Sequence, residues 1–211
     1  FRNWAKTDPQ GAFETIIGRM GPGNEQKQAL NSLFAMVAFQ DTARARELFA
    51  GLDPDQRRSV IHPVARAHAQ EDPKAAVAWA GKLEDPQSKR SALTAIFEEW
   101  PGIAPEEACA NGLKLEEPDL RQQCLDIALR SWSNRDAAEA MIWAVQNLDD
   151  SLRESLISGT LLGAWADQDL DAAKDWVLEL PSGTLRDNCV SQLALKWSQY
   201  DAAATGEWLN K

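Results

Sequence analysis

Apolar residues recur along the chain at the spacing of an α-helix, and the same stripe returns about every 32 residues. One stripe falls at i, i+1, i+4, i+5 and i+8 and comprises Cys124, Leu125, Ala128, Leu129 and Trp132. Its copy one period earlier comprises Ala92, Leu93, Ile96, Phe97 and Trp100. A shorter stripe also recurs, such as Ala76, Trp79, Ala80 and Leu83. This pattern predicts alternating long and short helices of roughly 15 and 11 residues, and no strand-type alternation competes with it.

The tryptophans repeat with the same period. Trp100, Trp132, Trp165 and Trp197 are separated by 32, 33 and 32 residues. Earlier in the chain, His68 holds the equivalent place, and Phe39 and Trp4 continue the series less regularly. A second series lies 11 residues later, at Trp79, Trp143, Trp176 and Trp208, which accounts for all nine tryptophans. A fixed period of this length indicates a repeat architecture, and we expect these rings to form its stacked core.

Residues that cap helix N-termini recur in step with the tryptophans. The predicted caps of the long helices are Asn24, Asp53, Asp85, Glu117, Asp150 and Ser182. The predicted starts of the short helices are Asp8, Asp72, Ala104, Asp136, Asp169 and Asp201. Proline follows several of them, as expected at a first helical position, where no amide partner is lost. Asp136 with Glu139 predicts an acidic capping box.

Helices this short are unstable alone and must bury their stripes by stacking on neighbours. We therefore predict an all-α protein, a right-handed α-solenoid (superhelix) of about six stacked helical hairpins forming a single domain over residues 1–211. The approximate units are residues 1–23, 24–52, 53–84, 85–116, 117–149, 150–181 and 182–211. Because the chain opens on Phe1 and its apolar pattern still runs at Leu209, we expect it to be part of a longer protein, which leaves its compartment undecided.

This layout resembles tetratricopeptide-type helical repeats over nearly the whole chain. The resemblance rests on aromatics near both helix ends, on a small residue early in each short helix and on proline between units. The residues concerned are Ala76, Ala108, Ala140, Ala173, Pro54, Pro86 and Pro118. The chain departs from that family in its period and in lacking the family's glycine in the long helix, so it resembles a tryptophan-rich variant. The resemblance implies a protein-binding scaffold but transfers no particular site.

The net charge of −10 lies in the second half of the chain. Residues 1–100 carry 13 basic and 13 acidic side chains, whereas residues 101–211 carry 9 basic and 19 acidic ones. Nucleic acids and anionic membrane surfaces both require clustered Lys and Arg. We therefore expect no nucleic-acid binding and no direct membrane binding in this part of the protein. No run of 18 apolar residues occurs either.

The cysteines and one group of aspartates bear on possible chemistry. Cys124 and Cys189 both lie eight residues before a marker tryptophan, where another unit places Ala92, so we expect them in the core. Asp167, Asp169 and Asp171 have the spacing of a calcium loop. The glycine and the glutamate that such a loop also needs are replaced by Ala172 and Leu178, so we interpret the aspartates as capping residues. No metal and no cofactor is predicted.

The histidines and the recurring basic residues have structural interpretations as well. His68 is expected in the core, and His62, more exposed on the pattern, could contact a ligand. Basic residues near the start of the long helices are Arg57, Lys89, Arg121, Arg153 and Arg186. We expect them to pair with the capping acids of adjacent units; contacts to ligand carboxylates are the alternative. Because no nucleophile with its base, phosphate loop or metal set occurs, the chain is not expected to be an enzyme.

One long helix differs from the others on the face opposite its apolar stripe. That face carries Ser155, Gly159, Thr160 and Gly163, where other units place larger polar residues. A glycine inside a helix costs about 1 kcal/mol relative to alanine, so two of them indicate that something approaches the backbone closely. The neighbouring helix, a bound peptide or a second chain would explain them.

The expected function is a scaffold that binds a protein or peptide on its long helices. Because of the acidic second half, a partner with a basic segment is expected at the glycine face, with Asp126 and Asp187 at the rim. Solvation of the surface would equally explain the charge. The alternative functions are a structural spacer, or an accessory domain of a longer envelope protein or of an enzyme whose catalytic part lies outside this chain.

Overall fold

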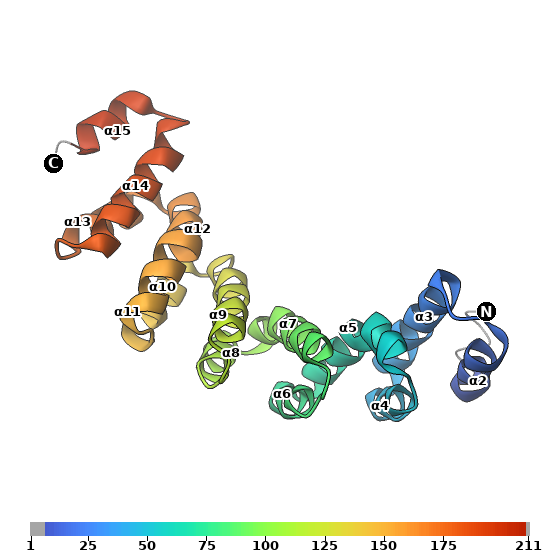
Figure 1. Ribbon diagram of the computed structural model, residues 1–211. Helices are drawn as coiled ribbons and strands as arrows, with labels where there is room; N and C mark the ends of the chain where they lie inside the picture. The colour runs from blue at the N-terminus through green and yellow to red at the C-terminus, as the bar shows by residue number, and fades with distance from the viewer. Residues whose placement is uncertain (1–6, 210–211) are drawn as a thin grey trace. The chain divides into compact units, whose positions relative to one another are not determined.

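The computed structural model describes residues 7–209, which lie in helices and the turns between them (Figure 1). No strand occurs in this range. The prediction of an all-α protein is therefore confirmed. Neighbouring helices pack on one another, as a helical repeat requires.

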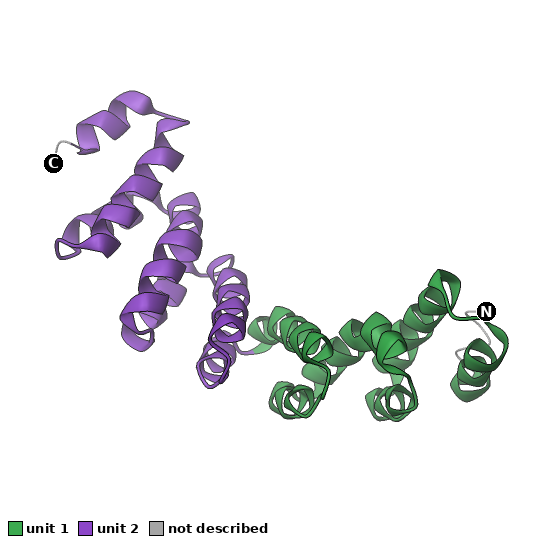
Figure 2. Cartoon of the chain, viewed as in Figure 1, with its two compact units in different colours: residues 1–103 green, residues 104–211 purple. Residues whose placement is uncertain are grey.

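The chain forms two compact units, residues 1–103 and 104–211 (Figure 2). The helices of unit 1 are α2 (Pro9–Arg19), α3 (Asn24–Gln40), α4 (Thr42–Ala50), α5 (Pro54–Glu71), α6 (Pro73–Gly81) and α7 (Pro86–Ile103). The long helix α5 packs against the long helices α3 and α7, and the short helices α4 and α6 also pack against α5. The core of unit 1 is made of the apolar faces of these helices, which carry buried residues such as Leu33 and Ile96.

Unit 2 continues the alternation of long and short helices. Its helices are α8 (Pro105–Gly112), α9 (Pro118–Ser133), α10 (Ala137–Asn147), α11 (Asp150–Leu156), α12 (Leu162–Gln168), α13 (Leu170–Glu179), α14 (Thr184–Ser198) and α15 (Ala202–Leu209). A π-helix, η1 (Ile157–Leu161), joins α11 to α12 to make one long helix. Helix α9 packs against η1 and α12, and α14 packs against the other side of the same long helix.

The predicted caps hold at most helix starts. The carboxylates of Asp8, Asp72, Asp136, Asp169 and Asp201 each accept a hydrogen bond from the backbone amide three residues later, over 2.8–3.0 Å. Asp53 and Asp85 cap α5 and α7 in the same way, and Asp53 forms a reciprocal capping box with Gln56. A cap is a local interaction between a side chain and the amides next to it, which is why sequence locates it.

Four of the predicted long-helix caps are wrong in detail. The capping residue is Gly23 rather than Asn24, Asp149 rather than Asp150, and Gly183 rather than Ser182. Glu117 stands at the start of α9, but its side chain accepts no capping hydrogen bond. Gly183 has φ near +157°, at the border of the region that favours glycine, and a glycine there leaves the chain free to turn into α14.

The two aromatic series meet as ring pairs inside single hairpins. The ring centroids are 5.7–6.2 Å apart in the pairs His68–Trp79, Trp132–Trp143, Trp165–Trp176 and Trp197–Trp208. Trp100 and Trp132 are buried, whereas Trp165 and Trp197 are only half-buried. The 11-residue offset between the series therefore brings the end of a long helix onto the short helix that follows. Trp4 lies outside the described residues.

Phe39 was expected to continue the aromatic series, and this is wrong. Its side chain is 82% exposed, and Val37 takes the buried place instead. The reason is the cap of the next helix: Asp41 caps α4, and the marker residue lies four positions before that cap in other units. Phe39 is consequently off the apolar stripe of α3.

The π-helix absorbs one extra residue in the repeat. The N-cap residues Glu117 and Asp149 are 32 positions apart, but Trp132 and Trp165 are 33 apart, so the extra residue lies within the long helix. The buried Ile157 and Leu161 correspond to Leu125 and Ala128 of α9. Three residues lie between Ile157 and Leu161, whereas only two lie between Leu125 and Ala128. A π-turn accommodates such an insertion because its hydrogen bonds span one residue more than those of an α-helix.

A proline in the middle of α5 is compensated by the neighbouring long helix. Pro63 has no amide hydrogen, so the carbonyl of Ser59, four residues earlier, loses its usual donor. The side-chain amide of Asn31 in α3 donates to this carbonyl over 2.8 Å. The contact therefore satisfies the backbone of α5 and joins α3 to it.

The recurring arginines bind the ends of the preceding short helices, not the capping acids that we expected. Arg57, Arg121, Arg153 and Arg186 donate to backbone carbonyls at or just beyond those ends, over 2.6–3.1 Å. The last carbonyls of a helix have no amide donor within the helix, and a guanidinium satisfies them. These arginines fix the turn between one hairpin and the next.

Candidate binding surfaces on the long helices

The predicted glycine face borders a small pocket in unit 2. The pocket has a volume of about 220 Å³ and is lined by Ser158, Gly159, Leu162, Gly163, Gln192, Leu193 and Lys196. A Cβ atom on Gly159 would meet no atom within 4 Å, and one on Gly163 would meet only Lys196 Nζ, at 3.9 Å. Close packing of the neighbouring helix therefore does not explain these glycines, contrary to one of our expectations.

The polar residues predicted beside the glycines mostly join neighbouring helices. Gln122 Nε2 of α9 donates to Ser155 Oγ over 3.0 Å, and the Thr160 hydroxyl donates to Asp126. Asp126 also accepts from Arg130 Nη2 over 2.7 Å. Ser155, Thr160 and Asp126 consequently lie in the seam between α9 and the next long helix.

Asp187 is placed differently from Asp126. It lies on α14 and is exposed, and its carboxylate forms no ion pair among residues 7–209. The two acids that we expected together at one rim therefore have different environments, one engaged between helices and one facing solvent.

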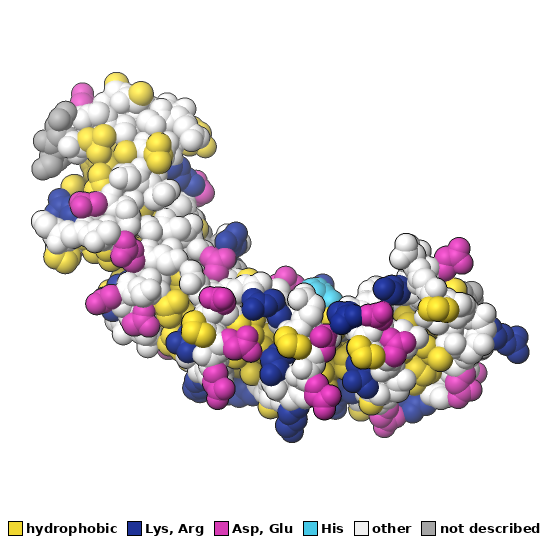
Figure 3. Space-filling view, in the orientation of Figure 1, with side chains coloured by type: hydrophobic (Ala, Val, Ile, Leu, Met, Phe, Trp, Pro, Cys, Tyr) yellow, Lys and Arg dark blue, Asp and Glu magenta, His cyan; other side chains and the backbone are white. Residues whose placement is uncertain are grey.

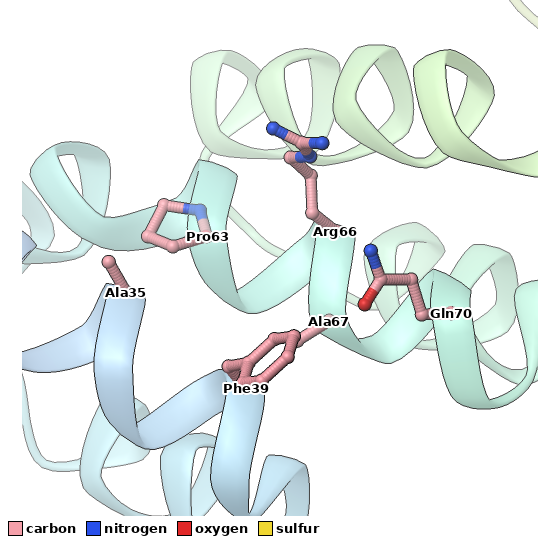
Figure 4. A pocket seen from close by; sticks show the side chains of 6 residues that line it. All are labelled: Ala35, Phe39, Pro63, Arg66, Ala67 and Gln70. Carbon is pink, nitrogen blue, oxygen red and sulfur yellow. The ribbon is translucent and has the colours of Figure 1, made fainter.

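A second surface, which sequence reasoning did not predict, lies between α3 and α5 of unit 1. Ala35 and Phe39 of α3 face Pro63, Arg66, Ala67 and Gln70 of α5 around a pocket of about 340 Å³ (Figure 4). Residues four apart on each helix lie on the same side, so they form the walls of a groove along the two helices. The Asp41 cap could have located Phe39 here from the sequence. It makes Val37 the buried marker residue of α3, and Phe39 then points away from the core.

Helix α7 fixes the polar residues of this groove. Arg66 pairs with Glu99, whose other oxygen accepts from Gln70 Nε2 over 3.1 Å. One turn earlier, His62 Nε2 lies 3.1 Å from a carboxylate oxygen of Glu98. Lys, Arg, Asp and Glu are interspersed over the visible face of unit 1 (Figure 3). The groove thus combines an exposed ring and an apolar floor with donors held in place by α7.

His68 belongs to the core, as predicted. It is 3% exposed, its ring packs edge-on against Trp79, and Arg46 Nη1 lies 3.1 Å from its Nε2. Because an arginine can only donate, Nε2 is the acceptor and the ring is neutral. Burial and then the positive charge of Arg46 lower the pKa of His68 below its ordinary value.

The cysteines are also core residues. Cys109, Cys124 and Cys189 have no exposed surface and carry free thiols. Burial raises the pKa of Cys109 to about 12 and that of Cys189 to about 11. These two thiols stay protonated at neutral pH, which leaves them unreactive as nucleophiles.

The three aspartates with calcium-loop spacing each have a different partner. Asp167 pairs with Lys196 at 2.6 Å, Asp171 pairs with Lys174 at 2.6 Å, and Asp169 caps α13. Within residues 7–209, no three His, Cys, Asp or Glu side chains come together in a group that could hold a metal ion. No helix in the described range is long and apolar enough to span a membrane.

Comparisons of the chain with protein-family models, with curated proteins and with solved structures found no match.

Proposed function

We propose that the protein is a binding scaffold that holds a segment of another protein in the groove between α3 and α5. The observation that carries this proposal is Phe39, an aromatic side chain 82% exposed beside a pocket of about 340 Å³. Aromatic side chains, phenylalanine included, are enriched at protein interfaces, where burial of the ring contributes to binding.

The groove has the features needed to hold an extended or helical segment. Ala35, Pro63 and Ala67 offer an apolar floor for a side chain of the partner. Arg66 and Gln70 are already oriented by Glu99, so their ordering adds little entropic cost on binding. The bound segment would bury the exposed ring of Phe39.

This function is consistent with the proposed architecture, a right-handed α-solenoid of about six stacked helical hairpins. The alternation of long and short helices, the ring pairs and the repeated arginine contacts support that architecture. In such repeats each unit contacts only its neighbours, and the long helices offer an extended surface. A structural spacer, or an accessory domain of a longer envelope protein or enzyme, remains the alternative function.

The glycine face of unit 2 is a second candidate contact. The space above Gly159 and Gly163 is open, so the backbone of a partner can approach it. The acidic character of residues 101–211 favours a basic segment there. Gly163→Leu would fill that space and should block such a partner while leaving the groove at Phe39 unaffected.

Site-specific photo-crosslinking tests the proposed function. A photoreactive phenylalanine analogue is placed at position 39 and, as a control, at position 142, because Ile142 is also an exposed apolar residue, at 58%. We expect one defined partner to be crosslinked from position 39 and not from position 142. Phe39→Ala should then weaken binding of that partner by about tenfold or more, as for an interface hot spot. Identical crosslinks from both positions, or none, would favour the spacer function.

A further inference from the structure

The α3 wall of the groove between α3 and α5 differs from the same face of the other long helices. Counted from the marker residues, the counterparts of Ala35 are Arg66, Glu98, Arg130, Gly163 and Leu195, and those of Phe39 are Gln70, Gly102, Asn134, Asp167 and Gln199. The Phe39 position is exposed in every one of these helices, so its exposure belongs to the repeat. What distinguishes α3, among the long helices of the described chain, is that both positions are apolar.

This wall also lacks charge. No Lys, Arg, Asp or Glu occurs from Gln28 to Gln40. Depletion of charge together with an aromatic residue is the composition found at the centre of protein interfaces. A partner that covered Ala35 and Phe39 with a charged side chain would find no counter-charge on α3, which is costly once water is removed. The α3 wall therefore fits an uncharged segment.

The α5 wall offers a hydrogen-bond acceptor and donors. Gln70 Nε2 donates to Glu99 over 3.1 Å, and since a carboxylate only accepts, the amide oxygen of Gln70 is left for another partner. Figure 4 shows this oxygen on the Phe39 side of the amide. At the rim, Arg66 donates to Glu99 through Nη2 alone. Within residues 7–209, Gln70 Oε1 accepts no hydrogen bond, and Arg66 Nε and Nη1 donate none.

These groups match the main chain of an extended segment. In an extended chain the N–H and C=O of one residue point to the same side, and the arrangement returns every second residue, about 7 Å further on. Arg66 and Gln70 are one helical turn apart, about 6 Å along α5. A helical segment could not use them, because its interior amides and carbonyls are already paired within the helix.

We propose that the groove between α3 and α5 binds an extended, uncharged segment of another protein. Its main chain meets Gln70 and Arg66, and one apolar side chain enters the pocket of about 340 Å³ beside Phe39. Because Glu99 neutralises Arg66, this wall attracts neither sign of charge. The proposal rests on the proposed scaffold function and names the class of segment that the scaffold holds.

Peptides selected against the whole chain test the proposal. A phage-displayed library of short random peptides is panned on the immobilised protein, and parallel panning on Phe39→Ala identifies peptides that bind elsewhere. Enriched peptides are synthesised with a fluorescein label, and their affinity is measured by fluorescence anisotropy. Each peptide is also made with a single N-methyl group on one main-chain amide after another, which removes one donor at a time and keeps the side chains.

We expect the enriched peptides to share one apolar residue between uncharged neighbours. N-methylation of one central amide should weaken binding about fivefold or more, as for the loss of one hydrogen bond. Gln70→Met keeps the length of the side chain but removes its acceptor, and it should weaken binding to a similar degree. The same N-methylation should cost little more in the Gln70→Met protein, because the two changes remove one contact.

A matched variant controls for the substitution itself. Gln87→Met changes an exposed glutamine of α7 that does not line the pocket, and it should leave binding unchanged. Because Gln70 is exposed, Gln70→Met should not disturb folding, which circular dichroism checks.

Several outcomes would overturn the proposal. They are enrichment of charged peptides, binding that tolerates every N-methylation, and binding that ignores Gln70→Met. In each case a loss of binding in Phe39→Ala would leave the scaffold function standing. Absence of any peptide enriched on the protein over Phe39→Ala would also overturn it, and crosslinking from position 39 then tests the scaffold function separately. Self-association that Phe39→Ala abolishes, seen by sedimentation velocity, would assign the groove to a second copy of the chain.

Discussion

At the scale of single residues, the repeat tolerates different side chains in one structural place. The marker position holds tryptophan in four units and His68 in another. His68, Trp132, Trp165 and Trp197 each pack against a tryptophan of the following short helix, whereas Trp100 packs against Phe97 of its own helix. A ring is not required in every unit, because Val37 holds this place in α3. The histidine differs from tryptophan in one respect, which is that it can take up a proton.

His68 should make the stability of the protein depend on pH. Its pKa is lowered in the folded state by burial and by Arg46, so the unfolded state binds the proton more tightly. The stability that comes from a neutral His68 is fully present above the unfolded pKa of about 6.5 and is lost as pH falls below it. In urea unfolding, the loss of stability between neutral and mildly acidic pH should be smaller for His68→Phe. An unchanged pH dependence would contradict this assignment.

Replacing Trp132 should destabilise the protein more than replacing Trp165. Trp132→Ala should lower the free energy of unfolding by about 3–5 kcal/mol, because it empties a buried aromatic site. Trp165→Ala should cost less than Trp132→Ala, because Trp165 is only half-buried, whereas Trp132 is 4% exposed. Denaturant unfolding of both variants measures the difference. An equal cost would show that exposure does not govern these sites.

At the scale of helices, neighbours complete each other's hydrogen bonding. Pro63 would leave the Ser59 carbonyl without a donor if Asn31 of α3 did not provide one. The arginines at the start of the long helices do the same for the ends of the short helices. Backbone carbonyls of one helix therefore receive their hydrogen-bond donors from residues of the neighbouring helices.

A double-mutant cycle tests the contact between Asn31 and the backbone of α5. Asn31→Leu should destabilise the protein by about 1 kcal/mol, the usual value of one hydrogen bond. In the Pro63→Ala background the same change should cost less, because residue 63 then has an amide that can donate to Ser59. Equal costs in the two backgrounds would mean that Asn31 acts independently of Pro63.

Deleting one residue should convert the π-helix into an ordinary α-helix. Removal of Gly159 leaves two residues between Ile157 and Leu161, as in the corresponding part of α9. We expect the variant to keep its helical circular dichroism and to melt at the same or a higher temperature. The matched control is deletion of Ile127 from α9, which should destabilise strongly because it rotates the rest of that helix out of register. If both deletions are equally harmful, the π-turn is not an inserted residue.

At the scale of the whole molecule, the two halves of the chain differ in net charge. The excess of acidic residues lies in residues 101–211, whereas the first hundred residues are balanced. In the described part of unit 2, Asp126, Asp150, Asp167 and Asp171 form ion pairs with Lys or Arg, which neutralise only part of the acidic excess. Unit 2 consequently carries a net repulsion that unit 1 lacks.

Added salt should therefore stabilise unit 2 more than unit 1. Salt screens repulsion between exposed charges beyond about 10 Å, and an excess of like charge opposes folding. Hydrogen exchange followed by mass spectrometry, at low and moderate salt, should show protection rising more in α9 to α14 than in α3 to α7. A uniform response of both units would show that the acidic excess does not affect stability.

Much of the architecture could be predicted because its determinants are local. The caps at Asp53, Asp72 and Asp136, the apolar stripes and the burial of Cys124 and Cys189 all follow from residues near in sequence. The cap misplaced at Asp150 instead of Asp149 comes from assuming one fixed distance between cap and marker tryptophan, which the inserted residue of the π-helix breaks.

The sequence by itself determined that this protein is helical, where nearly every helix lies and which residues point inward, because hydrogen bonding within a helix and the spacing of apolar residues are encoded along a few turns. Only the tertiary structure decided which outward residues remain uncovered. Phe39 is exposed, and the space beside Gly159 is open, because no side chain of a neighbouring helix fills either place. That depends on the packing of segments distant in sequence, and these uncovered surfaces are where we expect partners to bind.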